Sequence, residues 1–267
     1  MFSLEEAYSQ GIKLIRNIVE DIRFGRKLYL NNVLTYANQM CKYLNDTSEI
    51  LTLLNKMQGK NPYMHSHSVN VALISYVIGK WLDFDNDKLE NLFQAGLLHD
   101  IGKAKIKDSI LNKEDALTWS EMELLKAHPI TAYRLLASVN IFNPQVLQAV
   151  AFHHERMDGT GYPLELKQDK INVYSRIIAI ADTYDAITSI RAYHERKSPL
   201  QALEEIKESS IDKLDPYICE IFINNVVEYY IGRSIRLSND QTGNITDINP
   251  NALSKPIVCC NDNYLDL

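Results

Sequence analysis

The chain has 267 residues, of which 46% are hydrophobic and 23% are charged. This composition is typical of a globular protein with a substantial core and excludes an extended disordered chain. The formal net charge of -6 at pH 7 argues against polymeric nucleic acid as the partner, since such partners are usually bound through a basic face. A small anionic ligand held by a few local cations remains compatible with this charge.

The sequence predicts neither a membrane span nor a secretory signal. No apolar stretch approaches the ~20 residues that a membrane-spanning helix needs. The first residues also lack a basic segment followed by an apolar one. The cysteines show no Cys-x-x-Cys spacing, and the adjacent pair among them is poorly placed for a disulfide: Cys41, Cys219, Cys259 and Cys260. We therefore expect reduced cysteines in a cytoplasmic protein.

Residues 1–60 are predicted to form an N-terminal helical segment. Apolar residues recur at helical spacing in residues 12–22 and 30–44. A third helix is expected to open at Ser48 and to stop near Gly59. This segment carries no chemistry, so we expect a packing element, and a homodimer formed through these helices is one assembly that the sequence leaves open.

Residues 61–231 are predicted to form the main domain, and their pattern is helical throughout. No stretch alternates with the period of a strand, which favours an all-α bundle. Prolines lie near several expected helix starts, where a missing N–H costs little: Pro129, Pro144, Pro199 and Pro216. The expected helices span residues 68–81, 87–100, 118–127, 129–138, 144–154, 173–190, 199–207 and 216–230.

Residues 232–267 are predicted to form a small C-terminal β-rich appendage. Residues 234–237 and 244–248 alternate in polarity around a turn-forming stretch at 238–243, which indicates a β-hairpin. Residues 256–259 are compatible with a third short strand. Because a lone hairpin is barely stable in water, we expect this one to pack on the bundle or to contact a partner.

Several histidines and carboxylates lie in apolar helical contexts on separate predicted helices. They are His67, His99, Asp100, His128, His153, His154 and Asp182. Each one alone has a structural explanation, such as a capping histidine or an aspartate paired with an arginine. Together they are harder to explain that way, because buried ionisable groups are costly unless they are paired or bind metal. The nitrogen and oxygen donors, without thiolate, favour iron, manganese or zinc over a structural cysteine–zinc site. His65 lies two positions from His67 and faces roughly the opposite side of the helix, so we assign only His67 and expect His65 at the surface.

These residues carry a family resemblance. His67, His99-Asp100 and Asp182 resemble, in order, the H…HD…D signature of HD-type metal-dependent phosphohydrolases. His128-Pro129, His153-His154-Glu155 and the Asp-Gly-Thr-Gly-Tyr-Pro segment at 158–163 are similar to the HD-GYP subfamily. Members of this family are bacterial phosphodiesterases that hydrolyse the second messenger cyclic di-GMP to pGpG or GMP. The resemblance therefore implies an HD-type helical bundle, with residues 61–231 as its catalytic domain, and a metal-dependent cyclic di-GMP phosphodiesterase.

Carried over by position, the resemblance also implies a set of site residues. Two divalent ions, iron or manganese with zinc also compatible, would be bound with Asp100 as the bridge. Lys103 would lie near the scissile phosphate, Tyr162 beside a guanine or phosphate, and Arg191 in the place of the substrate-binding arginine. The catalytic residues would then be Asp100 and Lys103, and the metal ligands would be His67, His99, Asp100, His128, His153, His154 and Asp182.

The chain departs from the family pattern at two places. Some HD-GYP proteins bind a third metal through a glutamate four residues before the first histidine, and that residue here is Tyr63, so we expect two ions. The segment that often reads Arg-Pro-Tyr followed by a basic residue is residues 191–194 here and ends in His194. Loss of a permanent cation at this position weakens attraction for phosphate near neutral pH. The preferred cyclic dinucleotide is therefore left open.

The mechanistic hypothesis is that a hydroxide bridging the two ions attacks phosphorus in line with the leaving 3′ oxygen, while Lys103 stabilises the developing charge. Glu155, Arg156 and Asp158 are expected to fix the orientation of the imidazoles. For Arg156 and Asp158, an ion pair that only holds the loop together is an equally good explanation. Gly159 and Gly161 are expected to supply backbone conformations that other residues disfavour. Two other functions remain open: hydrolysis of a different cyclic dinucleotide or nucleotide, and a signalling receptor that binds a cyclic dinucleotide without hydrolysing it.

Overall fold

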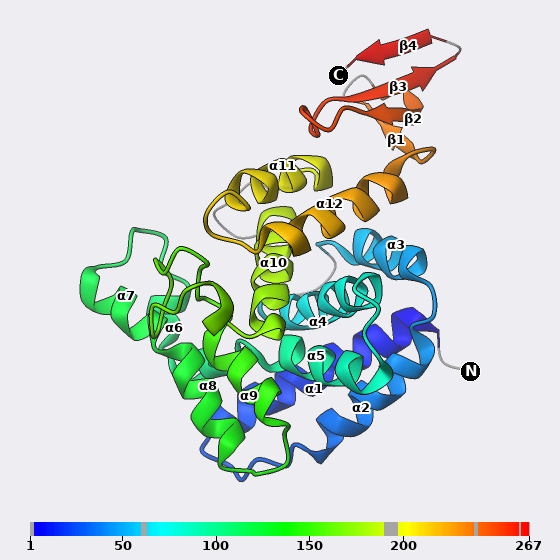
Figure 1. Cartoon of the computed structure of the whole chain (residues 1–267). Helices are drawn as coiled ribbons and strands as arrows, with labels where there is room; N and C mark the ends of the chain where they lie inside the picture. The colour runs from blue at the N-terminus through cyan, green and yellow to red at the C-terminus, as the bar shows by residue number, and fades with distance from the viewer. Residues whose placement is uncertain (1–2, 60–62, 190–196, 238–239, 262, 267) are drawn as a thin grey trace.

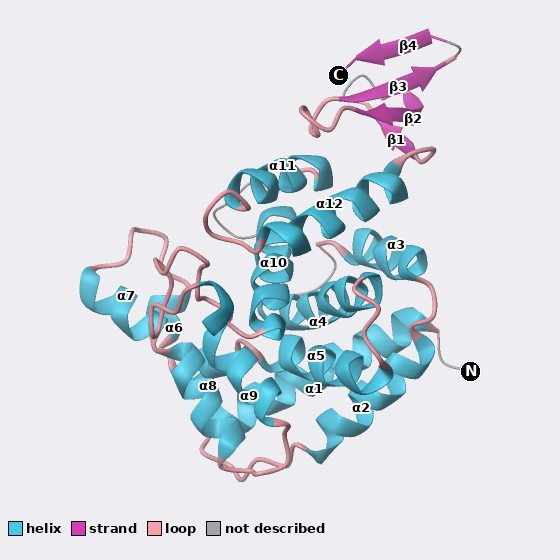
Figure 2. Ribbon diagram, viewed as in Figure 1, coloured by secondary structure: helices cyan, strands magenta, loops and turns pink. Residues whose placement is uncertain are grey.

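The computed structural model describes residues 3–59, 63–189, 197–237, 240–261 and 263–266. The helices gather into a bundle, and a small antiparallel sheet projects from it at the C-terminal end (Figures 1 and 2). The predicted all-α class, with an N-terminal helical segment and a small β appendage, is confirmed. Among the described helices, none has both the length and the apolar character that crossing a membrane would require.

The first three helices are α1 (Leu4–Arg23), α2 (Asn31–Tyr43) and α3 (Thr47–Met57). α1 starts at a capping box, in which Ser3 and Glu6 satisfy each other's backbone N–H groups. Its apolar face packs on α4 (Tyr63–Trp81), and α2 packs on α5 (Asn86–Leu98). The buried side chains of these helices belong to the same hydrophobic cluster as those of the bundle and the sheet. The domain boundaries at residues 60 and 231 stay predictions.

Helix α4 is the central element of the bundle. It contacts α1, α3, α5, α12 (Pro216–Tyr230) and α10 (Val173–Thr188), and its residues 66–79 are buried on every side. A helix that is buried all round needs little amphipathic pattern, and apolar residues lie on all its sides, with buried polar residues concentrated near its start. The packing of α10 on α4 brings two distant parts of the chain together, and both of them carry predicted metal ligands.

The remaining helices follow the predicted positions within a few residues: α7 (Trp119–Lys126), α8 (His128–Ala137), α9 (Pro144–Phe152) and α11 (Pro199–Ser209). The sequence did not predict the short elements η1 (Ile101–Lys105), α6 (Asp108–Leu111) and η2 (Gln168–Lys170). At η1, Gly102 allows a close approach, because a Cβ there would lie 2.0 Å from the His128 carbonyl oxygen. The missing side chain therefore brings the end of α5 against the start of α8.

The C-terminal appendage has more strands than predicted. β1 (Ser234–Arg236), β2 (Thr242–Ile248), β3 (Pro256–Cys260) and β4 (Asn263–Asp266) form an antiparallel sheet in that order. The hairpin and the third strand are confirmed, whereas β4 was not expected. Ile245 and Val258 are buried, and the Lys207 ammonium on α11 donates to the Pro250 carbonyl at 2.5 Å. The sheet is therefore attached to the bundle, which is one of the two arrangements expected for a hairpin that is barely stable alone.

Candidate metal centre

Three of the predicted ligand histidines lie at helix ends and share one local hydrogen bond. In each case Nδ1 faces the backbone carbonyl three residues earlier: His99 to Gly96 at 2.7 Å, His128 to Leu125 at 2.7 Å and His153 to Val150 at 2.8 Å. A carbonyl only accepts, so each Nδ1 carries the proton and each Nε2 keeps its lone pair. The helix ends themselves thus set the tautomer that metal binding through Nε2 needs.

The fourth histidine, His67, is oriented by a carboxylate. Its Nδ1 lies 2.7 Å from Oδ2 of Asp185 on α10. Its Nε2 lies 3.1 Å from Oδ1 of Asp182 and 3.5 Å from Oδ2 of Asp100. His67 is therefore held from behind by one aspartate and faces two others in front.

Asp100 lies between two groups of imidazoles. Its Oδ1 is 3.1 Å from Nε2 of His128 and 3.9 Å from Nε2 of His153. Its Oδ2 is 3.4 Å from Nε2 of His99 and 3.5 Å from Nε2 of His67. The donor atoms form two sets, each contained within 4.8 Å: Asp100, His128, His153 and His154, and His67, His99 and Asp100. Asp100 is the residue common to both sets.

The donor chemistry of this cluster fits divalent ions. Nε2 of His99 and Oδ1 of Asp100 are buried and, within the described part of the chain, have no hydrogen-bond partner. Lone pairs in such positions are costly unless something binds them, and imidazole and carboxylate are ligands of iron, manganese and zinc. Six of the seven predicted ligands therefore fall within these two sets, which could hold two ions sharing Asp100. The seventh, Asp182, lies beside them at 3.1 Å from Nε2 of His67.

The charge states of the acidic groups also suit cations. Burial alone would raise the pKa of Asp100, but Lys103 and the imidazoles of His99 and His128 outweigh it and hold that pKa well below its usual range. Burial likewise opposes the effect of His67 on Asp182, whose pKa is also held well below normal. Both carboxylates are therefore ionised.

The histidines divide into two groups by protonation. Burial, reinforced by neighbouring imidazoles, lowers the pKa of His153. Burial lowers the pKa of His154 to about 3, so both rings are neutral and ready to bind a metal. For His67, burial lowers the pKa, but hydrogen bonds to Asp182 and Asp185 outweigh it and raise the pKa to about 9. A metal must therefore displace a proton at His67.

Lys103 and Tyr162 lie at the edge of this cluster. The Lys103 ammonium donates to Oδ2 of Asp100 at 2.5 Å and is partly exposed. The Tyr162 ring stacks on His154, with ring centroids 4.7 Å apart and an interplanar angle of 26°. The Lys126 ammonium lies 5.8 Å from the centroid of the same tyrosine ring. A cation and an aromatic face thus stand beside the ligands, where an anionic substrate with a base could bind.

The two glycines of the loop have different reasons to be glycine. Gly159 has φ +84, the left-handed region expected for it. Gly161 does not have a left-handed backbone, and a side chain is excluded there because the neighbouring backbone is too close. A Cβ there would lie 2.4 Å from the backbone nitrogen of Arg156 and 2.5 Å from the His154 carbonyl oxygen. Gly161 thus lets the loop fold back against the histidine pair.

Glu155, Arg156 and Asp158 were expected to orient the imidazoles, and their hydrogen bonds go elsewhere. The buried Glu155 carboxylate accepts the backbone N–H groups of Leu164 at 2.6 Å and Leu166 at 2.9 Å. Arg156 donates to the backbone carbonyls of His153 and Glu155, and Asp158 accepts from Thr160. These residues organise the loop, because the imidazole nitrogens are already held by helix carbonyls and by Asp185.

Sequence reasoning missed Asp185. The available signal was its spacing from Asp182, since residues three apart share a face of a helix. His65 was expected at the surface and is instead half-buried. This burial, together with the nearby Arg16 and Arg23, lowers its pKa. Arg191 and His194 lie outside the described residues.

The chain is similar to known proteins over most of its length. A model of the HD domain family matches residues 52–218, and the chain belongs to this family. A cyclic di-GMP phosphodiesterase of Pseudomonas aeruginosa is 30% identical over 250 residues, which are 94% of this chain and 60% of that protein. A 3'3'-cGAMP-specific phosphodiesterase of Vibrio cholerae is 32% identical over 230 residues, 86% of this chain and 50% of that protein. A cyclic di-GMP phosphodiesterase of Thermotoga maritima is 34% identical over 177 residues, 66% of this chain and 48% of that protein.

A solved structure supports the fold. The HDG"Y"P protein Bd1817 of Bdellovibrio bacteriovorus superposes with a TM-score of 0.68 at 16% identity, over 82% of this chain and 70% of that one. The predicted HD-type helical fold is thereby confirmed. The chain spans about half to three-fifths of the length of these curated relatives.

Proposed function

We propose that this protein is a bacterial metal-dependent phosphodiesterase that hydrolyses cyclic di-GMP to pGpG, to GMP or to both. One observation carries the proposal: the Asp100 carboxylate is shared between two sets of imidazole donors. A shared carboxylate is the arrangement that a two-metal hydrolytic site requires. The relatives named cyclic di-GMP phosphodiesterases support the choice of substrate.

The proposed centre holds two divalent ions, iron or manganese, with zinc also compatible with the donors. One ion would use Asp100, His128, His153 and His154, and the other would use His67, His99, Asp100 and Asp182. When bound, such ions supply Lewis acidity toward the phosphate and lower the pKa of water.

The chain's own residues would bind and orient the substrate. The Lys103 ammonium lies beside Asp100 and would neutralise a phosphate oxygen as charge develops on it. Tyr162, fixed by its stacking on His154, would offer a face for a guanine. We assign Arg191 to substrate binding from its place in the sequence. Its substitution by alanine should raise the Michaelis constant more than it lowers turnover.

A second candidate substrate is 3'3'-cGAMP, because a relative specific for it covers 86% of this chain. The metal ligands contact only phosphate, and an aromatic face stacks on any base. The described residues therefore do not favour one purine edge over another. Cytoplasmic location and a homodimer through the N-terminal helices also stay predictions.

The decisive experiment is anaerobic purification, elemental analysis and incubation with cyclic di-GMP or 3'3'-cGAMP, followed by identification of the products. We expect two ions per chain and linear products from cyclic di-GMP. Preferential turnover of 3'3'-cGAMP would select the second candidate. Tight binding of either nucleotide without hydrolysis, by protein with both ions bound, would contradict the enzymatic proposal in favour of a receptor.

A further inference from the structure

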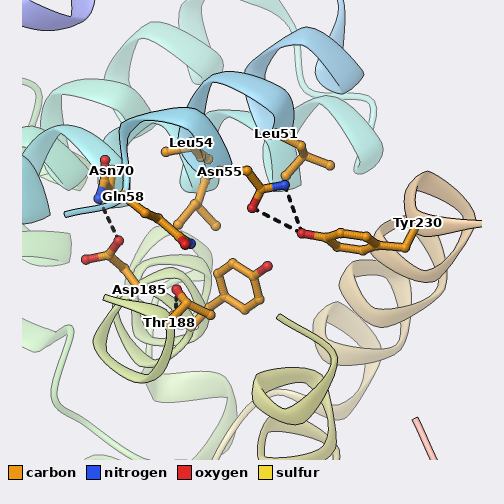
Figure 3. A pocket seen from close by; sticks show the side chains of 10 residues that line it. Leu51, Leu54, Asn55, Gln58, Asn70, Asp185, Thr188 and Tyr230 are labelled. Atoms are coloured by element: carbon orange, nitrogen blue, oxygen red, sulfur yellow. Dashed lines mark hydrogen bonds between the residues drawn. The ribbon is translucent and has the colours of Figure 1, made fainter. Parts of the chain in front are cut away.

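A chain of buried hydrogen bonds runs from the N-terminal helix to His67. The Tyr8 hydroxyl on α1 donates to Oδ1 of Asn70 at 2.7 Å, and the Asn70 amide donates to Oδ1 of Asp185 at 2.7 Å. Asp185 then accepts from His67 through its other oxygen, Oδ2. Figure 3 shows the bond between Asn70 and Asp185 beside a small cavity. Three helices, α1, α4 and α10, are thus connected through one predicted ligand.

The burial of this chain makes its geometry specific. Tyr8 is 0%, Asp185 3% and Asn70 8% exposed. Polar groups so deep in a core are costly unless each finds its partner, and a fully satisfied buried network fixes one arrangement of its side chains. The Ser189 hydroxyl adds a second donor to Oδ1 of Asp185 at 3.0 Å. That leaves Oδ2 directed at His67.

Tyr8 decides which way the Asn70 amide points. Burial, with a smaller contribution from the Asp185 charge, raises the pKa of Tyr8, so its hydroxyl stays protonated and available as a donor. That donor holds the amide oxygen of Asn70 toward α1 and the amide nitrogen toward Asp185. A flipped amide would place its oxygen against the Asp185 carboxylate, and two acceptors cannot form a hydrogen bond.

We propose that Tyr8 and Asn70 are positioning residues, which hold Asp185 and through it set the orientation of His67 for metal binding. The proposal rests on the proposed function in one respect, namely that His67 is a metal ligand. α1 lies outside residues 52–218, the part that the HD family model matches. Helix α1, which lies beyond the matched domain, therefore contributes to the affinity of the site for metal.

The test uses metal affinity rather than activity. Metal-free full-length protein is titrated with Mn²⁺, and the free ion is counted by electron paramagnetic resonance. Tyr8→Phe keeps the ring in the core and removes only the hydroxyl, so we expect about 3- to 10-fold weaker binding of the weaker-held ion. The matched control is Tyr76→Phe, which removes a buried hydroxyl on α4 that donates to the Leu44 carbonyl and should leave the affinity unchanged.

A double-mutant cycle separates positioning from general loosening of the core. Asn70→Ala alone should weaken binding about 10-fold or more. If Tyr8 acts through Asn70, adding Tyr8→Phe to Asn70→Ala should weaken binding little further. Unchanged affinity in Tyr8→Phe, or effects of the two substitutions that multiply, would overturn the proposal.

A reference variant distinguishes failure of the relay from failure of the metal site. His67→Ala should lower the affinity more than any relay variant does. Full affinity in His67→Ala would mean that the proposed ligand set itself is wrong. Lowered affinity in His67→Ala together with wild-type affinity in Tyr8→Phe would reject the relay alone.

Discussion

Oδ2 of Asp185 lies 2.7 Å from Nδ1 of His67, and both side chains are buried. His99, His128 and His153 each face, with the same ring nitrogen, the backbone carbonyl three residues earlier. His67 lies within α4, and its Nδ1 faces a carboxylate on α10 instead. Its orientation therefore depends on a residue 118 positions away in the sequence.

Asp185→Asn should weaken metal binding. The amide preserves shape but removes the charge that fixes and polarises the His67 ring, and losses of this kind typically cost about 10- to 100-fold in metal affinity. Metal content after dialysis and Mn²⁺ titration measure the effect. Asp158→Asn is the control, since Asp158 contacts Thr160 in the loop and should leave the affinity near wild type. Equal affinities in wild type and Asp185→Asn would reject the role of Asp185.

Asp100→Ala should abolish both metal retention and hydrolysis. The substitution removes the carboxylate common to both donor sets, so neither ion keeps its full ligand set. Helical content by circular dichroism should stay close to wild type, because Asp100 follows the end of α5. Elemental analysis and product formation are the measurements. A variant that hydrolyses cyclic di-GMP at the wild-type rate would refute the metal-site interpretation.

Metal binding near neutral pH should release protons, chiefly from His67. Its pKa is raised from 6.5 to about 9 in the metal-free fold, so binding displaces about one proton per chain. Because the pKa of His67 is raised, its protonated ring also stabilises the metal-free fold. This contribution is fully present below pH 6.5 and is lost as the pH rises through about 9. Calorimetry in buffers of different ionisation enthalpy measures the release.

The proton release has its own control. Asp185→Asn removes one of the groups that raise the His67 pKa, so fewer protons should be released near neutral pH. Binding by the wild-type protein without proton release would show that His67 is already neutral.

Glu155→Gln should loosen the loop that carries Tyr162. The buried carboxylate accepts two backbone N–H groups, and an amide has only one acceptor oxygen to offer them. A buried donor left without its partner costs about 1–3 kcal/mol. We expect lower thermal stability and a raised Michaelis constant. Glu165→Gln, at an exposed position of the same loop, should change neither quantity, and an equal effect of the two substitutions would count against this role for Glu155.

The sequence by itself determined the fold class and the ligand types. Helical periodicity placed the main helices, and the ordered histidines and aspartates predicted which side chains would converge. Helical periodicity is a local signal, and histidines and aspartates have few roles in a buried core other than pairing or metal binding. The N-terminal helices gave no sign of their link to the site, because Tyr8 looks like any apolar residue on the buried face of α1.

Only the tertiary structure decided how the cluster is held together. It showed that Asp100 faces two imidazole pairs, because Gly102 lets η1 lie against the backbone of α8. It also moved the orienting role from Glu155 to Asp185. Hydrogen bonds between residues far apart in the sequence depend on how helices pack, and helix packing leaves no pattern in the local order of residues. The sequence therefore predicted the ligand set, and the packing of α10 on α4 determined which residue orients His67.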